Sequence, residues 1–507
     1  MHQRLEELTG QRRLRHRDAA RDLTRLPDPA VPAGRDRVPQ IRHVVILMME
    51  NHSFDNYLGT LGRGDGLPDP LPTNPAADGR PVAVRHFRSV AQREGAPSQS
   101  WRASHVQWHE GANDGFVRSV EELDVAAPDD AAMGYWDADD LPFYADLART
   151  FPLADRWFCS CLGPTFPNRR FLVSGTANGL IDDELASIID YPRGGTLFDL
   201  LDRYGVSWAN YHHGSGRELS RTRFLAGGRL QLDRRARLLG RHLFPRFVGQ
   251  VRGQLQCTAN LYPLGFLRIR RHLLPVERFF AEAEAGTLPA VSIVDPDFEH
   301  ASEENPQDVQ LGEGFAAAVV DAVLRGPGWR HTLLVWLYDE HGGYYDHVPP
   351  PAAVEPDGVR PRSLLDAGQP LRWLLRHSGL GRHVREDDVA AGRYDRLGFR
   401  VPAVLVSPWS KPGFVSSEVY DHTSVLKLIE EKWNLPPLTE RDAAARAPWD
   451  MVDLEAAPAF ADAPTLAPPA RRWSDPGTPG ARRSTGPASS WRRATRAVTS
   501  WRPNAST

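Results

Sequence analysis

The residues with the clearest chemical potential follow a short apolar run in the second half of the chain. Residues 333–337 are rich in β-forming types and predict a buried strand. Asp339, Glu340 and His341 follow directly, and a double glycine comes next. Adjacent carboxylates at the end of a core strand are costly to bury unless a positive charge lies between them, and glycines let the backbone approach a ligand closely. The segment predicts half of a metal-centred site, with a strand end bearing solvated acids as the alternative.

Two other predicted strands end in similar chemistry. Residues 43–49 form an apolar run that is followed by Glu50 and Asn51, and residues 288–294 are followed by Asp295. Helical patterns separate the three strands, which indicates an α/β protein. In open parallel sheets of this class, ligands bind beyond the carboxyl ends of the strands. We therefore expect distant segments of the chain to deliver oxygen ligands to one edge of one sheet.

A candidate nucleophile lies between two prolines. Thr165 stands between Pro164 and Pro167, and a run that can form a helix follows. The free amides and the dipole at a helix N-terminus favour an anion such as phosphate. The alternative is that Thr165 only caps the helix.

Several histidines are candidates for the same site. His105 and His109 are four residues apart, so a helix would place both on one face near Asp114. Such a pair could bind a metal, but it is more often a hydrogen-bonded surface pair, and we retain His105 alone. His422 precedes an apolar-periodic helix and is interpreted as a pocket residue; the alternative is that Asp421 caps this helix and His422 is merely close by.

Composition excludes several classes of protein. The 507 residues carry a formal charge of −3, which argues against a polyanion-binding protein held by net charge. The arginine-rich residues 213–272 carry no nucleic-acid recognition motif, and the three cysteines fit neither a disulfide framework nor a zinc finger. No apolar run approaches the ~20 residues of a membrane span. Residues 1–37 contain a twin arginine but no apolar segment, so we expect no signal peptide and a cytoplasmic protein, or a secreted one if the true start lies upstream.

The expected organisation is one α/β domain with appendages. Residues 1–37 form a charged arm, and residues 38–440 form the domain, with polar insertions at about 213–272 and 350–393. Residues 441–507 form an Ala/Pro/Arg-rich extension that is largely disordered at its end. The tryptophans and arginines of this tail could touch an anionic lipid surface, although a solvated tail is the simpler interpretation.

Four segments together resemble the bacterial phospholipase C / acid phosphatase phosphoesterase family. They are residues 50–59, 163–169, 339–348 and 420–424, whose order and spacing fit across roughly residues 38–470. The resemblance implies an alkaline-phosphatase-like three-layer α/β/α sandwich with a mostly parallel central sheet. It also implies a hydroxyl nucleophile bound to a divalent metal.

The resemblance assigns roles to individual residues. It makes Thr165 the nucleophile, and the implied metal ligands are Glu50, Asn51, Thr165, Asp339 and Glu340. Phosphate binding falls to Asn51, His105, His347 and His422, and either His105 or His347 protonates the leaving group. Oxygen ligands suit a hard cation such as Ca²⁺, Mg²⁺ or Mn²⁺, while leaving Zn²⁺ open. A metal-bound hydroxyl is an activated nucleophile, so we expect a phosphothreonine intermediate. His341 is interpreted as a support for these ligands or a surface residue.

The expected function is metal-dependent phospholipase C-type hydrolysis of a phosphodiester. The alternatives are an acid phosphatase-like phosphomonoesterase and, from another class, an inactive phosphoester- or lipid-binding protein on the same scaffold. Where relatives carry a His-Pro-Pro-like run, this chain has Glu303-Glu304-Asn305-Pro306, which puts substrate selectivity in doubt. The expected partner is a phosphoester or phospholipid substrate, with transient contact to a membrane surface and no obligate protein partner.

Overall fold

The structure is a computed structural model that describes most of the predicted domain. It describes residues 25–92, 97–122, 128, 130–183, 191–213, 261–262, 269–298, 300–361 and 392–473. Most of the two predicted insertions, the first part of the arm and the end of the extension lie outside these residues.

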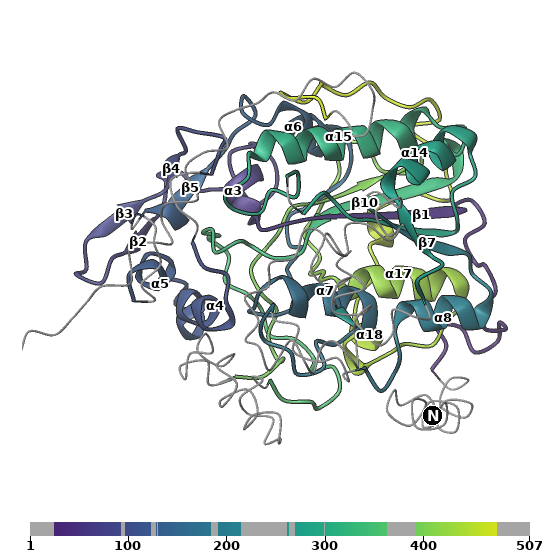
Figure 1. The fold of residues 1–507 in the computed structure, drawn as a ribbon, viewed down its shortest axis with the longest axis horizontal. Helices are drawn as coiled ribbons and strands as arrows, with labels where there is room; N and C mark the ends of the chain where they lie inside the picture. Colours follow the sequence, from purple (N-terminus) through teal and green to yellow (C-terminus); the bar gives the residue numbers. More distant parts are fainter. Residues whose placement is uncertain are drawn as a thin grey trace, which may run out of the picture.

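An eight-stranded sheet forms the centre of the domain (Figure 1). Its order is β12 (Val415–Ser416), β6 (Leu153–Ala154), β11 (Ala403–Val406), β10 (Thr332–Tyr338), β1 (His43–Met49), β9 (Val291–Val294), β7 (Trp208–His212) and β8 (Leu273–Pro275). In this sheet β11 is the one strand that is antiparallel to its neighbours, β10 and β6. The predicted, mostly parallel sheet is confirmed.

The two central strands are apolar along their whole length because both faces of the sheet are covered. Every residue of β10 is buried, as are six of the seven in β1. Continuous apolar runs are typical of parallel strands that helices cover on both sides. The two strands pair in parallel with Met49 opposite Tyr338, so the residues that follow them emerge together.

Helices lie on both faces of the sheet and complete three layers (Figure 1). One layer contains α6 (Pro142–Thr150), α14 (Val276–Ala285) and α15 (Val309–Arg325). The other contains α7 (Thr165–Ser174), α8 (Leu197–Tyr204), α17 (Thr423–Trp433) and α18 (Glu440–Ala444). The expected three-layer α/β/α sandwich is confirmed.

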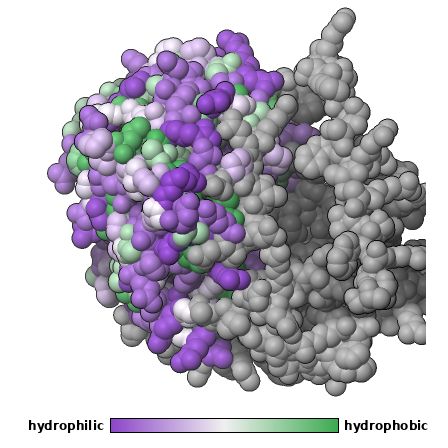
Figure 2. Space-filling model, turned by 90° about the vertical axis from the view of Figure 1, so that its left-hand side faces the viewer, coloured by the Kyte–Doolittle hydropathy of each residue, from purple (hydrophilic) through white to green (hydrophobic). Residues whose placement is uncertain are grey.

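A smaller lobe lies beyond the carboxyl end of β1, at the left of Figure 1. It contains α3 (Phe54–Leu58), the paired strands β2 (Thr73–Pro75) and β3 (Pro81–Ala83), the pair β4 (Arg85–His86) and β5 (Gly134–Tyr135), and the helices α4 (Trp101–Trp108) and α5 (Phe116–Glu122). Short 3₁₀ helices span His109–Gly111 and Ala131–Met133 in this lobe. Two others, Trp329–His331 and Trp449–Met451, lie elsewhere in the chain. The face of this lobe in Figure 2 is mostly hydrophilic, with scattered apolar spots.

The ends of the described chain pack against the domain. Arg25 forms two hydrogen bonds of 2.9 Å with the Glu440 carboxylate, and Trp473 stacks on Phe280 of α14 with ring centroids 5.4 Å apart. Among the described residues, no helix is both long and apolar enough to cross a membrane.

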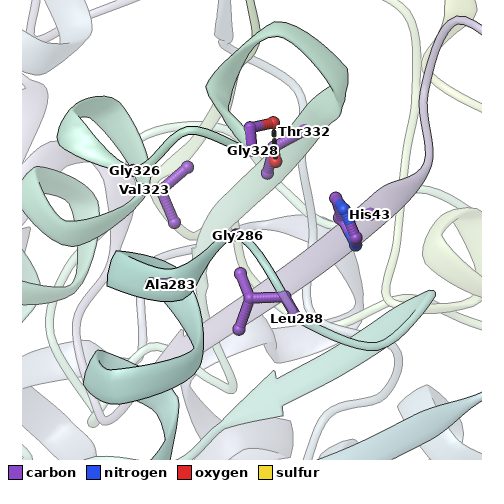
Figure 3. A pocket seen from close by; sticks show the side chains of 8 residues that line it. All are labelled: His43, Ala283, Gly286, Leu288, Val323, Gly326, Gly328 and Thr332. Carbon is purple, nitrogen blue, oxygen red and sulfur yellow. Dashed lines mark hydrogen bonds between the residues drawn. The ribbon is translucent and has the colours of Figure 1, made fainter.

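A small pocket opens at the other edge of the sheet (Figure 3). His43 and Thr332, the first residues of β1 and β10, line it with Leu288 and with residues of the α14 and α15 ends. Because it lies at the amino ends of these strands, it is separate from the acidic residues that follow their carboxyl ends.

Candidate active site

The ends of three neighbouring strands bring acidic residues together. Glu50 follows β1, Asp339 follows β10 and Asp295 follows β9, and β1 lies between the other two strands in the sheet. The backbone amide of Asn51 donates a 3.2 Å hydrogen bond to Asp339 Oδ1, which joins the ends of β1 and β10 directly. The predicted convergence at one edge of the sheet is therefore present.

The double glycine makes this close approach possible. Gly342 has φ +66°, and a Cβ at this position would lie 1.9 Å from the Asn51 carbonyl oxygen. Gly343 has φ +81°, and its Cβ would lie 2.7 Å from the Ser98 carbonyl oxygen. The sequence predicted close approach of a ligand to these glycines, whereas the structure shows close approach of other backbone segments. Asn51 itself has φ +70°, a conformation that non-glycine residues adopt at a cost and mostly at functional sites.

Helix α7 carries the candidate nucleophile to the same edge. Thr165 is its first residue and is 7% exposed, and Pro164 occupies the N-cap position. The capping role that the sequence left open for Thr165 therefore does not apply. The Thr165 hydroxyl forms no hydrogen bond within the described part of the chain. The neighbouring Phe166 amide, which was expected to favour phosphate, donates 2.7 Å to Asp183 Oδ1.

Arg169, one turn along α7 from Thr165, ties this helix to the acidic strand ends. Its Nε donates 2.7 Å to Asp339 Oδ2, and its Nη1 lies 3.4 Å from Asp295 Oδ1. Its Nη2 donates to the carbonyls of the last two residues of β1 and lies 4.0 Å from Glu50 Oε1. Residues four apart share one helix face, so the first turn of α7 lies over the carboxylates.

Three buried oxygens at this edge have no hydrogen-bond donor among the described residues. They are Glu50 Oε2, Asn51 Oδ1 and Glu340 Oε1. Carboxylate and amide oxygens can only accept, and burying them without a partner is costly. Oxygens of this kind are the ligands of hard divalent cations. The residues present therefore fit a cation, and Glu50, Asn51 and Glu340 are the ones best placed to hold it.

Asp339 differs from these three residues because both of its oxygens have partners. Oδ1 accepts from the amides of Asn51 and Glu340, and Oδ2 accepts from Arg169. Both lone pairs of Oδ1 are therefore used by backbone amides, and the role of Asp339 as a metal ligand stays a prediction.

The electrostatics of the site also favour a positive charge. Burial, followed by the Glu304 and Asp339 carboxylates, raises the pKa of Glu50 well above its ordinary value. Burial, followed by Asp339, does the same to the pKa of Glu340. Both shifts mean that the negative form lacks solvation and opposite charge, which a bound cation would supply.

His422 and His105 lie near this edge. His422 is fully buried, its Nε2 donates 2.6 Å to the Asp339 carbonyl, and burial lowers its pKa. His105 in α4 bonds through Nδ1 to the Trp101 carbonyl of its own helix at 2.7 Å, and burial lowers its pKa as well. The Trp101 ring lies 3.1 Å from the position of a Cβ built on Gly163, so it places α4 beside the loop that leads to Thr165.

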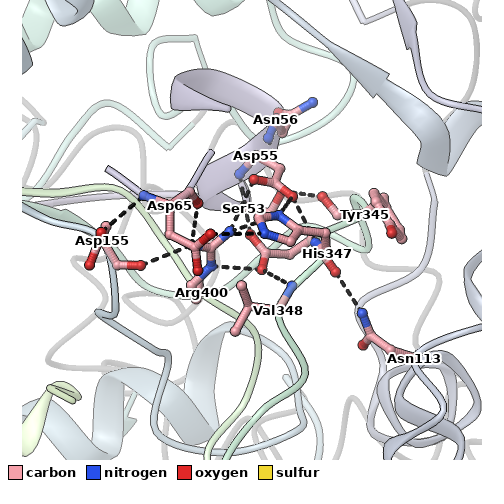
Figure 4. Close-up of polar contacts among 11 residues, drawn as sticks. Ser53, Asp55, Asn56, Asp65, Asn113, Asp155, Tyr345, His347, Val348 and Arg400 are labelled. Atoms are coloured by element: carbon pink, nitrogen blue, oxygen red, sulfur yellow. Dashed lines mark hydrogen bonds and ion pairs between the residues drawn. The ribbon is translucent and has the colours of Figure 1, made fainter. Parts of the chain in front are cut away.

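His347 belongs to a neighbouring network (Figure 4). Its Nδ1 lies 2.7 Å from Asp55 Oδ2, and its Nε2 lies 3.2 Å from Asp65 Oδ1. Arg400 donates to both Asp55 and Asp346, at 3.0 and 2.8 Å. Burial lowers the pKa of His347, but the Asp55 carboxylate outweighs this and leaves the pKa raised. No described contact joins His347 to the metal-ligand candidates, so its predicted catalytic role stays a prediction.

Sequence reasoning named no role for Arg169, Asp183 or Gln107. The only signal for Arg169 was its i+4 spacing from Thr165, and no pattern pointed to Asp183. Glu304 lies close enough to the acidic centre to raise the pKa of Glu50, after the larger effect of burial.

A second group of possible metal ligands lies in the smaller lobe, in and beside the β4–β5 pair. Ligand atoms of His86, Asp137 and Asp140 lie within 4.8 Å of one another, and His86 Nε2 is 2.6 Å from Asp140 Oδ2. His86 is exposed, unlike the buried residues at the strand ends. His109, which the sequence analysis set aside, is also exposed and pairs with Asp114 at 2.6 Å.

Comparison with known proteins identifies the class. The profile of the Phosphoesterase family matches residues 41–436, which contain every site residue named above. The chain belongs to this family.

Several curated proteins that are similar to this chain are named as phospholipases C. The chain is 30% identical over 443 residues to the hemolytic phospholipase C of Pseudomonas aeruginosa, covering 80% of this chain and 54% of that protein. It is 29% identical to phospholipase C A of Mycobacterium tuberculosis, covering 78% and 73%, and 26% identical to the non-specific phospholipase C3 of Arabidopsis thaliana, covering 81% and 73%. The chain therefore spans about half the length of the Pseudomonas relative. A solved protein of the alkaline phosphatase superfamily from Vibrio parahaemolyticus shares 10% identity at a TM-score of 0.36, covering 88% of this chain and 78% of that one.

Proposed function

We propose that this protein is a metal-dependent phosphoesterase that hydrolyses phosphodiesters of the phospholipase C kind. The observation that carries the proposal is the group of donorless buried oxygens on Glu50, Asn51 and Glu340, beside the helix that begins at Thr165. Membership of the Phosphoesterase family and the names of the relatives support the same reaction class.

In the proposed reaction, Thr165 Oγ1 attacks the phosphorus atom and the bond to the leaving alcohol breaks. The products of this step are the leaving alcohol, which takes up a proton, and a phosphothreonine that still carries the second ester group of the substrate. Water then attacks the same phosphorus, releases the phosphomonoester of that second group and returns a proton to the Thr165 hydroxyl. The cation would lower the pKa of the threonine hydroxyl and offset charge on the phosphoryl oxygens. The Thr165 hydroxyl suits this role because it is almost buried yet bonded to no described residue.

The histidines would divide two tasks. His105 and His422 would bind the phosphate together with Asn51. Each ring donates one N–H to a backbone carbonyl, so its other nitrogen would donate to the phosphate only in the protonated form, which a bound anion would favour. His347, whose pKa is raised, would carry a proton near neutral pH and is the better candidate for protonating the leaving group. If so, His347→Ala should slow hydrolysis of alkyl esters far more than hydrolysis of p-nitrophenyl esters, whose leaving group needs no proton.

Thr165 provides the central test. We expect Thr165→Ala to abolish hydrolysis of p-nitrophenyl phosphorylcholine and Thr165→Ser to retain part of it, and chelator should inactivate the wild type. Quenching a ³²P-labelled substrate should leave label on threonine. Equal rates for wild type and Thr165→Ala on every phosphoester tried would rule out the enzyme. A preference for p-nitrophenyl phosphate would instead identify a phosphomonoesterase.

A further inference from the structure

The His341 ring is held in one tautomer at the edge of the acidic centre. It is 1% exposed, and its Nε2 lies 2.7 Å from Gln107 Oε1. The Gln107 amide group is oriented by its other end, because its Nε2 donates 2.9 Å to the Ser98 carbonyl and 3.1 Å to Ser119 Oγ. Oε1 therefore faces His341 as an acceptor, and His341 Nε2 must carry the proton.

In this tautomer His341 Nδ1 carries no proton, and its lone pair has no hydrogen-bond donor. The atom is buried, and no described residue donates to it. It lies 3.3 Å from Glu340 Oε2, another acceptor, which already accepts a 2.8 Å hydrogen bond from the Gly342 amide. Two lone pairs facing each other in a buried place repel unless something positive lies between or beside them.

The separation of these two atoms suits a shared metal ion. Nitrogen and oxygen ligands lie about 2.0–2.2 Å from Zn²⁺, so two ligands of one tetrahedral ion lie about 3.3–3.6 Å apart. The Gln107 contact also matches the usual arrangement of a metal-binding histidine, whose other ring nitrogen donates to an oxygen of the protein.

A second buried histidine provides a contrast. His52 is fully buried as well, but its Nδ1 lies 2.7 Å from Asn56 Oδ1 and its Nε2 lies 3.1 Å from the Glu303 carbonyl. Both ring nitrogens of His52 are thus engaged in the protein, whereas His341 has one nitrogen available for a ligand.

We propose that His341 Nδ1 is a ligand of the cation at this centre, next to Glu340, with Gln107 as its positioning residue. Imidazole suits Zn²⁺ and related transition-metal ions better than Ca²⁺ or Mg²⁺. The centre should therefore select a transition-metal ion, in contrast to the hard cation that the oxygen ligands alone predict. This inference rests on the proposed function because it concerns the same centre.

The test measures metal binding directly, on the full chain in a His86→Ala background that removes the surface His86–Asp137–Asp140 group. After chelator treatment and dialysis, Zn²⁺ and Ca²⁺ affinities are measured by titration calorimetry. Pulsed electron paramagnetic resonance of the Cu²⁺-loaded protein reports ¹⁴N coupling from bound imidazole. We expect one Zn²⁺ site, at least 100-fold tighter than Ca²⁺, with a clear ¹⁴N signal.

Variants assign the nitrogen. Gln107→Met, which removes a supporting residue, should weaken Zn²⁺ binding by about 10–100-fold. His341→Gln should weaken Zn²⁺ binding by more than this and should abolish the ¹⁴N signal. His52→Gln, the matched control, should keep both the signal and the affinity. If His341→Gln does not fold, a ¹⁴N signal that persists in His422→Gln and His52→Gln, together with weaker Zn²⁺ binding in Gln107→Met, decides the question.

Three results would overturn the proposal: a site without ¹⁴N coupling, unchanged Zn²⁺ affinity in His341→Gln, or a signal that persists in His341→Gln and disappears in His422→Gln. Thr165-dependent hydrolysis alongside any of these would leave the proposed function standing and remove only the His341 assignment. Hydrolysis that does not depend on Thr165, together with an intact ¹⁴N signal, would contradict the proposed function and leave the His341 assignment standing.

Discussion

The close contact between Gly342 and Asn51 allows a test of how backbone packing affects activity, because Gly342→Ala adds a single methyl group at this contact. Alanine at φ +66° costs about 1–2 kcal/mol on backbone grounds alone. Its Cβ would also lie 1.9 Å from the Asn51 carbonyl oxygen, so the two segments must separate by about 1.5 Å to restore an ordinary contact. Overpacking of this kind adds about 1–3 kcal/mol. We expect Gly342→Ala to lower the free energy of unfolding by about 2–5 kcal/mol.

The same displacement should affect the reaction, because Asn51 is a candidate ligand. A misplacement of about 1 Å at a reacting centre can cost about 100-fold in rate. We therefore expect Gly342→Ala to reduce kcat on p-nitrophenyl phosphorylcholine by at least that factor under conditions where the protein remains folded.

Gly413→Ala is the matched control. Gly413 has φ +61°, but no atom lies within 4 Å of a Cβ built there. Its alanine variant should lose only the backbone contribution, about 1–2 kcal/mol in urea unfolding, and keep its kcat. Equal losses of stability in the two variants, with kcat preserved in both, would refute the steric argument.

Three further predictions concern a buried arginine, a buried glutamate and the proposed cation. Arg400→Met should destabilise the protein by about 3–5 kcal/mol in urea unfolding, because it removes the guanidinium that pairs with two buried aspartates. Arg278→Met, which removes an exposed arginine from an i,i+4 helix pair, should leave the urea midpoint almost unchanged. Burial raises the pKa of Glu303 from 4.5 to about 8 against the effect of three tyrosine hydroxyls. Between these two pH values the folded chain keeps a proton that the unfolded chain releases. The free energy of unfolding should therefore fall as the pH rises from about 4.5 to 8, by up to about 1.4 kcal/mol per pH unit, and Glu303→Gln should flatten this part of the stability–pH profile. Stripping the cation with chelator should lower the melting temperature of the wild type only slightly and abolish its hydrolysis of p-nitrophenyl phosphorylcholine, and an unaffected rate would contradict metal dependence.

The α/β class and the acidic edge of the sheet could be predicted because local sequence indicates both, whereas the three layers were predicted from the family resemblance. Continuous apolar runs rich in β-forming residues before Glu50 and Asp339 indicate strands covered on both sides, and parallel strands bring the residues that follow them to one edge. The two-residue strands β6 and β12 were not predicted, since a segment that short has no period of its own.

The partners of the site residues could not be predicted, because they depend on which distant side chains meet after folding. His347 belongs to a segment that resembles the family, but nothing local shows that Asp55 and Asp65 contact its two ring nitrogens. The contact between Gln107 and His341 joins residues 234 positions apart, so it too depends on the folded chain. Sequence patterns thus indicate which residues carry chemistry, and the fold decides which of their atoms remain available.

Arg169 has a consequence for how the protein would respond to a shortage of metal. Its guanidinium lies among the carboxylates of Asp295, Asp339 and Glu50 and already balances part of their repulsion. An emptied centre would therefore retain an internal counter-ion, and the scaffold would survive until the ion returned. If the proposed cation is present, inhibition by chelators should accordingly be reversible on reconstitution with metal.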